Sequence, residues 1–553
     1  MASSSSSSSP LMLFLIPFLL FSVSWASSHH DVHENLLQCF ISQYSSIPIS
    51  QVVYTQNNSS YLAILDSTIQ NPRFSTPTTP KPQLIITPLT ESHVQVAVSC
   101  SRKYGVQIRT RSGGHDYEGL SYVSDVPFIL VDLVNFQSIS VNVKDNSAWV
   151  QSGATLGQVY YRIAEKSKTL AFPAGLCPSV GVGGHLSGGG YGMLMTKYGL
   201  AADNVIDAQM VDANGIVLNR VSMGEDLFWA IRGGGGASFG IILSWKITLV
   251  PVPPIVTVFR LNKFLGEGAI KLLHRWQYVA PNLPKDLFLK AILDALPSQS
   301  GERIVRASFD ALFLGSADKL APLMEEGFPE LGLKLKDCIQ MSWVESTLYF
   351  YYFPLGTSLD VLLNRTRNKD FFKAKSDYVK EPISENGLEG LWNRLLDDIE
   401  VGQVIFSPYG GRMSEITESQ IPFPHREGNL YMIHYRVAWE EKGIIASNMH
   451  ISWIRKLYSY MAPYVSKFPR AAYINYRDLD LGTNHNNGLT SYSQAKVWGH
   501  KYFKRNFERL ILVKITVDPT NFFRNEQSVP AFTSGGNKKS AFLCYFILFF
   551  ILM

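Results

Sequence analysis

GVGGHLSGGGYG, residues 181–192, decides how this sequence is interpreted. Two more glycine clusters share its character, RSGGHDYEG at residues 111–119 and RGGGG at residues 232–236. Glycine lets backbone N–H groups turn toward an anion and lets the chain approach it closely, as a pyrophosphate requires. The clusters therefore predict a site for a phosphate-bearing cofactor. Tight packing turns in a β-rich domain are the alternative interpretation.

Familiar glycine motifs do not fit these clusters. None ends in Gly-Lys-Ser/Thr, as a P-loop does, and Leu186 stands where the Rossmann pattern requires Gly or Ala. The nucleophile motif Gly-x-Ser-x-Gly fails around Ser187, because His185 replaces its first glycine. The sequence thus disfavours a P-loop, an NAD site of the Rossmann type and an α/β-hydrolase.

Composition narrows the class further. The 553-residue chain is 46% hydrophobic and 17% charged, which excludes a disordered chain and a polytopic membrane protein. No long basic run accompanies the net charge of +5, so no nucleic-acid partner is expected. No metal site is predicted, since His29-His30-x-x-His33 fits a disordered start of the mature chain better than a transition-metal site.

Both ends of the chain carry apolar segments. Residues 11–21 have the length of a signal-peptide core, and cleavage is expected after about Ala26, which predicts export. Residues 541–553 are mostly apolar and follow small residues at 534–536, a pattern that resembles a GPI-anchor signal with a short polar spacer. A loosely packed tail is the alternative, so membrane attachment is expected only if the anchor signal is used.

Glycosylation sequons and cysteines fit an exported protein. Sequons begin at Asn57, Asn58 and Asn364. Cys39 and Cys100 can pair in an oxidising compartment, although the sequence alone leaves that pairing open. The cysteine count of five is odd, so at least one thiol has no disulfide partner within the chain.

Hydrophobic patterning predicts an α/β start followed by β-rich chain. Prolines at 251, 253 and 254 break the pattern and indicate a domain edge. The expected strands are residues 84–86, 106–108, 129–131, 139–143, 148–150, 205–211 and 241–247, and the expected helices are residues 91–104, 156–166, 317–327 and 493–506.

Three motifs closely resemble the plant berberine bridge enzyme-like family: SGGHDYEG at residues 112–119, PAGLCPSVGVGGH at 173–185 and NYRDLDLG at 475–482. The resemblance runs from about Cys39 to Pro530. It implies an α+β, two-domain flavoprotein of the PCMH or vanillyl-alcohol oxidase type. The implied parts are a signal peptide (1–26), an FAD-binding domain (27–255), a substrate-binding domain on an antiparallel sheet (256–472), a C-terminal segment returning to the FAD domain (473–532) and an apolar tail (533–553).

The resemblance also implies how FAD is held. His115 would bond to the flavin 8α-methyl and Cys177 to flavin C6, which gives FAD a double covalent tether and accounts for one unpaired cysteine. Cys39 and Cys100 would form the disulfide of the family. The other cofactor-binding residues implied are Ser112, Gly113, Gly114, Val180, Gly181, Gly183, Gly184, His185, Gly188 and Tyr476.

Alcohol oxidation by a flavin needs a proton acceptor, because removal of the hydroxyl proton eases hydride transfer from carbon. Tyr476 matches the tyrosine assigned this role in several family members, and Tyr117 and Tyr191 match aromatic positions of the pocket. Tyrosine has an ordinary pKa of about 10, so a nearby cation or hydrogen-bond donor must favour the phenolate.

Residues at two places affect how far the activity of the family can be expected of this chain. Val180 matches a gatekeeper position where valine accompanies oxidases, which favours O2 as acceptor and H2O2 as product. Met432 and His434 depart from relatives that carry Lys or Glu and often Gln or Glu at these positions. We hypothesise that His434 replaces the polar pocket group and tunes Tyr476; a hydrogen-bonded sheet histidine is the alternative.

The expected protein is a secreted, monomeric FAD-dependent oxidase of the apoplast or cell wall, with the vacuole left open. Its substrate would be a small alcohol or sugar, such as a monolignol or an oligosaccharide. Two alternatives stand beside it: an oxidative cyclase of specialised metabolism, and a flavin-loaded binding or defence protein with vestigial activity. Intact His115, Cys177, Val180 and Tyr476 argue against the vestigial alternative.

Overall fold

Short apolar strands of the N-terminal half pair into a mixed four-stranded sheet, β1-β2-β4-β3. Its strands are β1 (Val53–Thr55), β2 (Leu84–Ile86), β3 (Gln107–Arg111) and β4 (Phe128–Asp132), and β4 runs parallel to both β2 and β3. Helix α3 (Glu91–Lys103) connects β2 to β3 and packs on one face, while α2 (Tyr61–Ser67) packs on the other. The α/β start predicted from the sequence is therefore confirmed.

An antiparallel five-stranded sheet follows, in the order β5-β6-β10-β8-β9. Helices α4 (Leu156–Lys166), α5 (Val182–Ser187) and α7 (Arg220–Ile231) share its core. A small ribbon pairs β7 (Leu170–Ala171) with β11 (Val250–Pro251). The strands of the five-stranded sheet are β5 (Ile139–Asn142), β6 (Ser147–Gln151), β8 (Val205–Val211), β9 (Val217–Leu218) and β10 (Ile241–Thr248).

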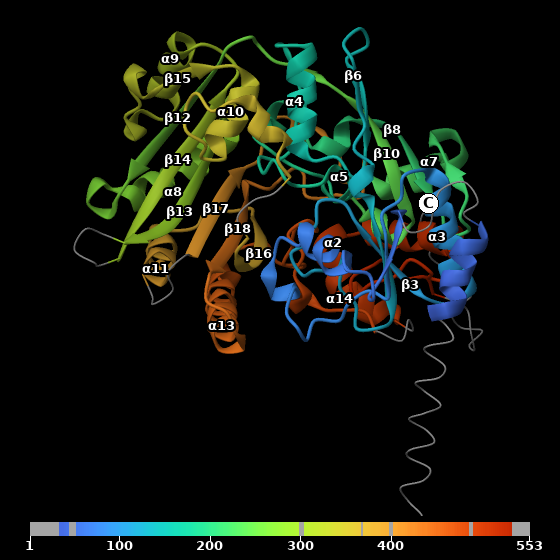
Figure 1. Cartoon of the computed structure of the whole chain (residues 1–553). Helices are drawn as coiled ribbons and strands as arrows, with labels where there is room; N and C mark the ends of the chain where they lie inside the picture. The colour runs from blue at the N-terminus through green and yellow to red at the C-terminus, as the bar shows by residue number, and fades with distance from the viewer. Residues whose placement is uncertain are drawn as a thin grey trace, which may run out of the picture.

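An antiparallel seven-stranded sheet forms the second body, in the order β15-β12-β14-β13-β17-β18-β16 (Figure 1). Alternate residues of its strands, among them Ala291, Phe406 and Tyr435, pack against helices α8 (Ala269–Val279), α11 (Glu385–Leu395) and α13 (Ile444–Met461). The opposite face is turned toward the first body. The strands are β12 (Val256–Lys263), β13 (Leu287–Pro297), β14 (Arg303–Phe313), β15 (Ile339–Met341), β16 (Phe371–Val379), β17 (Gly402–Pro408) and β18 (Tyr431–Trp439).

The C-terminal segment returns to the first body, where its red helices lie beside blue and cyan elements (Figure 1). The helix expected at 493–506 is α14 (Tyr492–Phe503), and a further helix, α15 (Asn506–Val517), was not predicted. Phe522 and Phe523 complete the core under α3. Both the α+β class and the two-part architecture follow from these elements.

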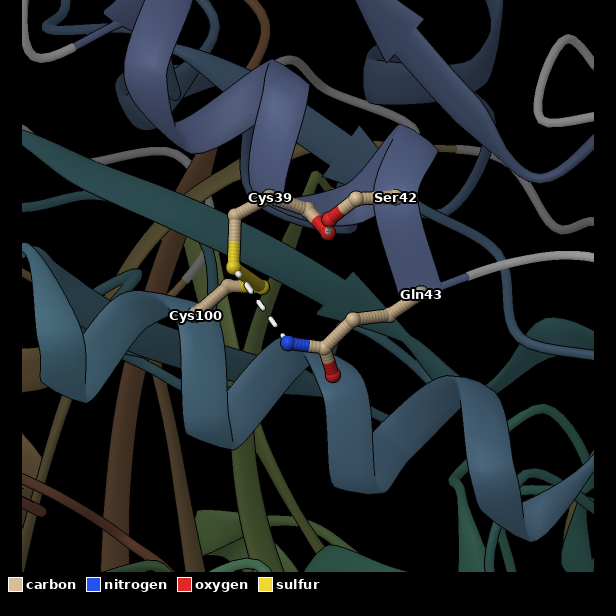
Figure 2. The surroundings of a disulfide bond; sticks show 4 residues. All are labelled: Cys39, Ser42, Gln43 and Cys100. Carbon is tan, nitrogen blue, oxygen red and sulfur yellow. Dashed lines mark hydrogen bonds between the residues drawn. A yellow bond between two sulfur atoms is a disulfide. The ribbon is translucent and has the colours of Figure 1, made fainter.

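Cys39 and Cys100 form a disulfide, as the resemblance implied (Figure 2). The bond ties a helix at residues 33–43 to α3, and Ser42 Oγ donates to the Cys39 carbonyl at 2.9 Å. Gln43 Nε2 lies 3.7 Å from Cys39 Sγ. Asn57, Asn58 and Asn364 are exposed, so each side chain is accessible to glycosylation.

This computed structural model describes residues 33–43, 51–297, 303–365, 369–396, 402–485 and 490–532. The predicted signal peptide, His29, His30 and the apolar tail at 533–553 lie outside these ranges. Within them, every helix is too short or too polar to cross a membrane. Helix α9 (Ala317–Gly327) packs in the core of the second body, whereas α10 (Trp343–Phe350) packs into the core that contains α4.

Candidate active site

A cavity of about 660 Å³ lies between the glycine-rich turns and the seven-stranded sheet. Every residue for which the sequence predicted a cofactor-binding or catalytic role lines it. The first body supplies the glycine clusters, the second body supplies one face of its sheet, and the C-terminal segment supplies residues 473–477. The site is therefore built where three distant parts of the chain meet.

Two glycine turns form the floor of the cavity by direct backbone contact. A Cβ on Gly181 would lie 2.3 Å from Gly113 N and 2.1 Å from Ser112 Oγ, so only glycine fits at this crossing. Gly184 differs, since a Cβ placed there would meet no atom within 4 Å, and Gly184 lines the cavity. Gly113 and Gly181 thus permit the crossing of the turns, whereas Gly184 leaves space for a ligand.

The two residues expected to tether the flavin share one neighbour. His115 Nε2 lies 3.0 Å from Ser179 Oγ, and Cys177 Sγ lies 3.5 Å from the same oxygen. Cys177 Sγ is also 3.6 Å from the Tyr351 hydroxyl. Ser179 therefore holds the imidazole and the thiol on the same side of the cavity.

His185 accepts hydrogen bonds from two segments of the site, one through its ring and one through its backbone. Its Nε2 accepts a hydrogen bond from Gly175 N at 3.1 Å, and its carbonyl accepts one from Asn475 Nδ2 at 2.9 Å. Burial lowers the pKa of His185 to about 4, so the ring is neutral and can accept. His185 thus connects the loop of Cys177 to the segment of Tyr476.

An aromatic cluster surrounds the Tyr476 hydroxyl. The Tyr476 ring stacks on His434 with centroids 3.9 Å apart and on Tyr117 with centroids 5.4 Å apart. Its hydroxyl hydrogen-bonds the Tyr191 hydroxyl, and Ser407 hydrogen-bonds Tyr191 as well. The structure therefore brings together all four residues that the sequence suggested for catalysis.

Burial controls the protonation of these groups. It raises the pKa of Tyr476 well above the ordinary value, and the neighbouring Tyr191 and Tyr117 add to that rise. Burial also raises the pKa of Tyr191, but hydrogen bonds with Tyr476 and Ser407 lower it. Burial and the charge of Arg436 lower the pKa of His434 to about 3, so its imidazole is neutral.

Buried ion pairs fix the segment that carries Tyr476. Lys373 Nζ bonds Glu118 and lies 2.8 Å from Asp478 Oδ1, and Lys375 Nζ lies 2.6 Å from Asp478 Oδ2. Arg477 Nε donates to Asp116 at 3.1 Å. These bonds join the C-terminal segment to strand β16 and to the loop that contains His115 and Tyr117.

The cavity suits FAD by its volume and by its unused polar atoms. Its volume lies within the range of roughly 300–1,000 Å³ that is usual for ligand pockets. Ser121 Oγ, Ser152 Oγ and Arg477 Nη1 are buried along its wall with no hydrogen-bond partner in the described protein. Such atoms are costly unless a ligand bonds them, and the open space at Gly184 suits the close approach of a phosphate.

The sequence analysis missed the wall that the seven-stranded sheet contributes. Lys290, Gln403 and Ser407 line the cavity, as do Tyr351 and Tyr352 after helix α10. The apolar strand LFLKAILDALP at residues 287–297 contains one lysine among alternating hydrophobic residues, and this signal could have identified Lys290. Met432, singled out from the sequence, is buried and does not line the cavity.

The fold and the site define an FAD-dependent oxidoreductase with a cavity suited to the cofactor between two bodies. A family model described as an FAD binding domain matches residues 82–220, and one described as berberine and berberine like matches residues 472–530. The chain is 55% identical over 540 residues to tetrahydroberberine oxidase from Berberis wilsoniae, a match that covers 97% of this chain and 99% of the relative. The chain belongs to the berberine bridge enzyme-like family.

Other relatives differ in the substrates that their names state. A monolignol oxidoreductase from Arabidopsis thaliana is 49% identical over 526 residues, which cover 94% of this chain and 97% of the relative. The structure of BBE-like 28 from the same plant matches with a TM-score of 0.86 at 50% identity, covering 90% of this chain and all of that one.

The grass pollen allergen Phl p 4 is a third kind of relative. It has glucose dehydrogenase activity and matches with a TM-score of 0.85 at 47% identity, over 90% of this chain and 100% of its own. An isoleucine-to-valine variant of that allergen is a glucose oxidase, and its structure matches with the same score, coverage and 48% identity.

Proposed function

We propose that this protein is a secreted oxidase that takes a hydride from a small alcohol, such as a monolignol or an oligosaccharide, and reduces O2 to H2O2. The observation that carries the proposal is the hydrogen-bonded hydroxyl pair of Tyr191 and Tyr476 in the cavity wall. Secretion to the apoplast rests on the predicted signal peptide and the exposed sequons, and a GPI anchor or a vacuolar destination is compatible with the same features.

The two tyrosines act as one proton acceptor. FAD, when bound, accepts a hydride from the substrate carbon and passes the electrons to O2. Tyr191 receives hydrogen bonds from Tyr476 and Ser407, and both favour its ionised form. Tyr476 then accepts the substrate hydroxyl proton as it passes its own proton to Tyr191, while the stacked rings of His434 and Tyr117 keep water from its faces.

Val180 supports O2 as the electron acceptor. It lines the cavity beside Gly181, at the position that we expected to control oxygen access. The oxidase activity of the isoleucine-to-valine variant of Phl p 4 is in line with a small residue that favours O2. A Val180→Leu variant is expected to be reduced by substrate as fast as the wild type but reoxidised by O2 more slowly, which stopped-flow absorbance separates.

The shared contact of His115 and Cys177 with Ser179 supports a double covalent tether to FAD. Protein precipitated with acid is expected to stay yellow, and the His115→Ala and Cys177→Ala variants are each expected to keep the colour through the remaining bond. Only the double variant is expected to release all of its flavin. A colourless wild-type precipitate contradicts the tether.

Oxidation beside an amine nitrogen is the second candidate. His434 and Tyr476 are both held neutral by burial, and a neutral amine gives up a hydride without prior loss of a hydroxyl proton. The relative from Berberis wilsoniae is named tetrahydroberberine oxidase. Aromatic side chains along the cavity, such as Phe288 and Phe372, also suit a polycyclic substrate.

Anaerobic mixing separates the two candidates. Coniferyl alcohol, cellobiose and tetrahydroberberine are added in turn to the loaded protein, and loss of flavin absorbance is followed. The alcohol proposal expects bleaching by coniferyl alcohol or cellobiose with a rate that rises as the pH rises. Bleaching by tetrahydroberberine alone favours the amine candidate.

A further inference from the structure

Lys290 is a buried cation in the cavity wall, and its Nζ lies 5.7 Å from the centroid of the Phe350 ring. Its side chain lies on strand β13, the residue is 7% exposed, and it lines the cavity. Within the described residues its Nζ donates no hydrogen bond, and the nearest carboxylate oxygen, Asp310 Oδ2, is 3.9 Å away. Burying an ammonium group without acceptors is costly, so a ligand that supplies acceptors is expected there.

The nearby carboxylate is already neutralised by another residue. Arg260 donates two hydrogen bonds to Asp310, from Nε to Oδ1 and from Nη2 to Oδ2, both 2.8 Å long. Two cations therefore face one carboxylate, which leaves one positive charge in excess. Burial lowers the pKa of Lys290, an effect that Asp310 opposes and Arg260 reinforces.

Lys290 lies close to the tyrosine pair that we propose as the proton acceptor. Ala291 pairs with Phe406 across strands β13 and β17, and both are buried on the helix-covered face. The next residues along these strands, Lys290 and Ser407, therefore lie side by side on the cavity face. Ser407 hydrogen-bonds Tyr191, so one side chain separates Lys290 from the Tyr191–Tyr476 pair.

We propose that Lys290 forms a subsite for a carboxylate group of the substrate. The inference rests on the proposed alcohol oxidation and narrows it to hydroxy acids, in which the carboxylate binds Lys290 while the hydroxyl meets Tyr476. A carboxylate beside Lys290 neutralises the excess charge and accepts the hydrogen bonds that the ammonium group lacks.

Binding of two matched probes tests the subsite without requiring turnover. 4-(Hydroxymethyl)benzoate carries the charge, and 4-(hydroxymethyl)benzamide has nearly the same shape without it. Each is titrated anaerobically into the flavin-loaded protein, and the dissociation constant is taken from the perturbation of flavin absorbance. The wild type is expected to bind the benzoate about tenfold more tightly, as a charge-assisted hydrogen bond allows.

Three variants test whether Lys290 causes the preference for the benzoate over the benzamide. Lys290→Met is expected to remove it while the affinity for the benzamide stays the same, and Lys290→Arg is expected to keep it. Lys290→Met leaves Asp310 bonded to Arg260, so no carboxylate loses its partner. Lys263→Met is the matched control, since Lys263 lies on the same sheet but outside the cavity lining.

Equal affinity of the wild type for the two probes, or no detectable binding of the benzoate, overturns the subsite. A preference that survives in Lys290→Met overturns it as well. If the preference depends on Lys290 but neither the hydroxy acid nor coniferyl alcohol nor cellobiose bleaches the flavin, the subsite stands and the alcohol oxidation fails. The two proposals therefore fail by different results.

Discussion

Ser407 acts on the proton affinity of the Tyr191–Tyr476 hydroxyl pair, which we propose as the proton acceptor, from a strand that the sequence did not connect with catalysis. Its hydroxyl lowers the pKa of Tyr191 by hydrogen bonding, against the larger effect of burial. In Ser407→Ala that bond is lost, so the pKa of the pair rises. The pH profile of flavin reduction is then expected to move to higher pH by about one unit. Anaerobic stopped-flow profiles measure the shift.

The matched variant for this test is Ser407→Thr, which keeps a hydroxyl at the same position. Its pH profile is expected to return toward that of the wild type. If Ser407→Ala and the wild type share one profile, Ser407 does not influence the pair. If Thr fails to restore the profile, packing rather than hydrogen bonding explains the effect.

We expect His434 to influence the same pair in the opposite direction. Because its pKa is about 3, it carries no charge at neutral pH, and its ring shields Tyr476 from water at a centroid distance of 3.9 Å. In His434→Ala water reaches Tyr476, the cost of burying its charge falls, and its pKa drops. The pH profile of flavin reduction is expected to move to lower pH by about one unit.

His434→Phe is the control, since it keeps a stacked ring and removes only the nitrogens. Its profile is expected to stay near that of the wild type. An unchanged profile in His434→Ala contradicts the hypothesis that His434 tunes Tyr476. A shift in both variants assigns the effect to the ring nitrogens instead of the ring.

The sequence revealed the site residues that stand inside motifs and missed those that stand outside them. His115, Cys177 and Tyr476 stand inside motifs that can be read along the chain. Lys290 and Ser407 come from separate strands, and only the register of β13 and β17 makes them neighbours. The lysine within an apolar strand could have marked Lys290 as unusual, but register depends on pairing between distant segments, so no local pattern could place Lys290 beside Ser407.

At the scale of elements, glycines that look alike in the sequence have two different roles in the turns. Gly181 crosses the backbone of Gly113, whereas Gly184 faces open cavity. In Gly181→Ala the new Cβ overlaps Gly113 N, so the turns must move apart, and the melting temperature is expected to fall by several degrees, with loss of bound flavin. Calorimetry and the ratio of flavin to protein absorbance measure both effects.

Gly184→Ala is expected to give a different result. Its Cβ contacts no protein atom, so the fold is expected to keep its stability while the flavin content falls. Gly266→Ala also adds a Cβ in open space, but away from the cavity, and is expected to change neither property. Equal flavin content in Gly184→Ala and the wild type excludes close approach of the cofactor to this position.

Element types were more predictable than their assembly. The strands near residues 84, 129, 205 and 241 and the helices near 91 and 156 follow from local hydrophobic patterning. The order β15-β12-β14-β13-β17-β18-β16 does not, because pairing over long sequence separations is set by the burial of the whole sheet. Helix α15 follows α14 after two residues, and the apolar pattern gives little sign of the break.

At the scale of the whole molecule, Lys373 joins three distant parts of the chain. It lies on β16 of the second body and bonds Glu118 from the loop of Tyr117 and Asp478 from the segment of Tyr476. All three side chains are nearly fully buried. Lys373 thus contributes to the contact between the two bodies, and we expect it to affect the width of the cavity between them.

Lys373→Met is expected to destabilise the protein because it leaves Glu118 without a close cation. Asp478 keeps Lys375 at 2.6 Å, but the nearest remaining cation to Glu118 is Arg73 at 3.9 Å. Removing one partner of a buried pair costs about 3–5 kcal/mol. The melting temperature is therefore expected to fall, and the flavin content is expected to fall with it, since the cavity wall loses its anchor.

The double variant Lys373→Met, Glu118→Gln tests the reason for this loss. It removes both charges, so it is expected to recover most of the stability that Lys373→Met loses. Lys285→Met is the matched control, because Lys285 pairs with Glu415 on the surface and such exposed pairs contribute about 0–1 kcal/mol. If the double variant is no more stable than Lys373→Met, the unpaired charge of Glu118 does not explain the loss of stability.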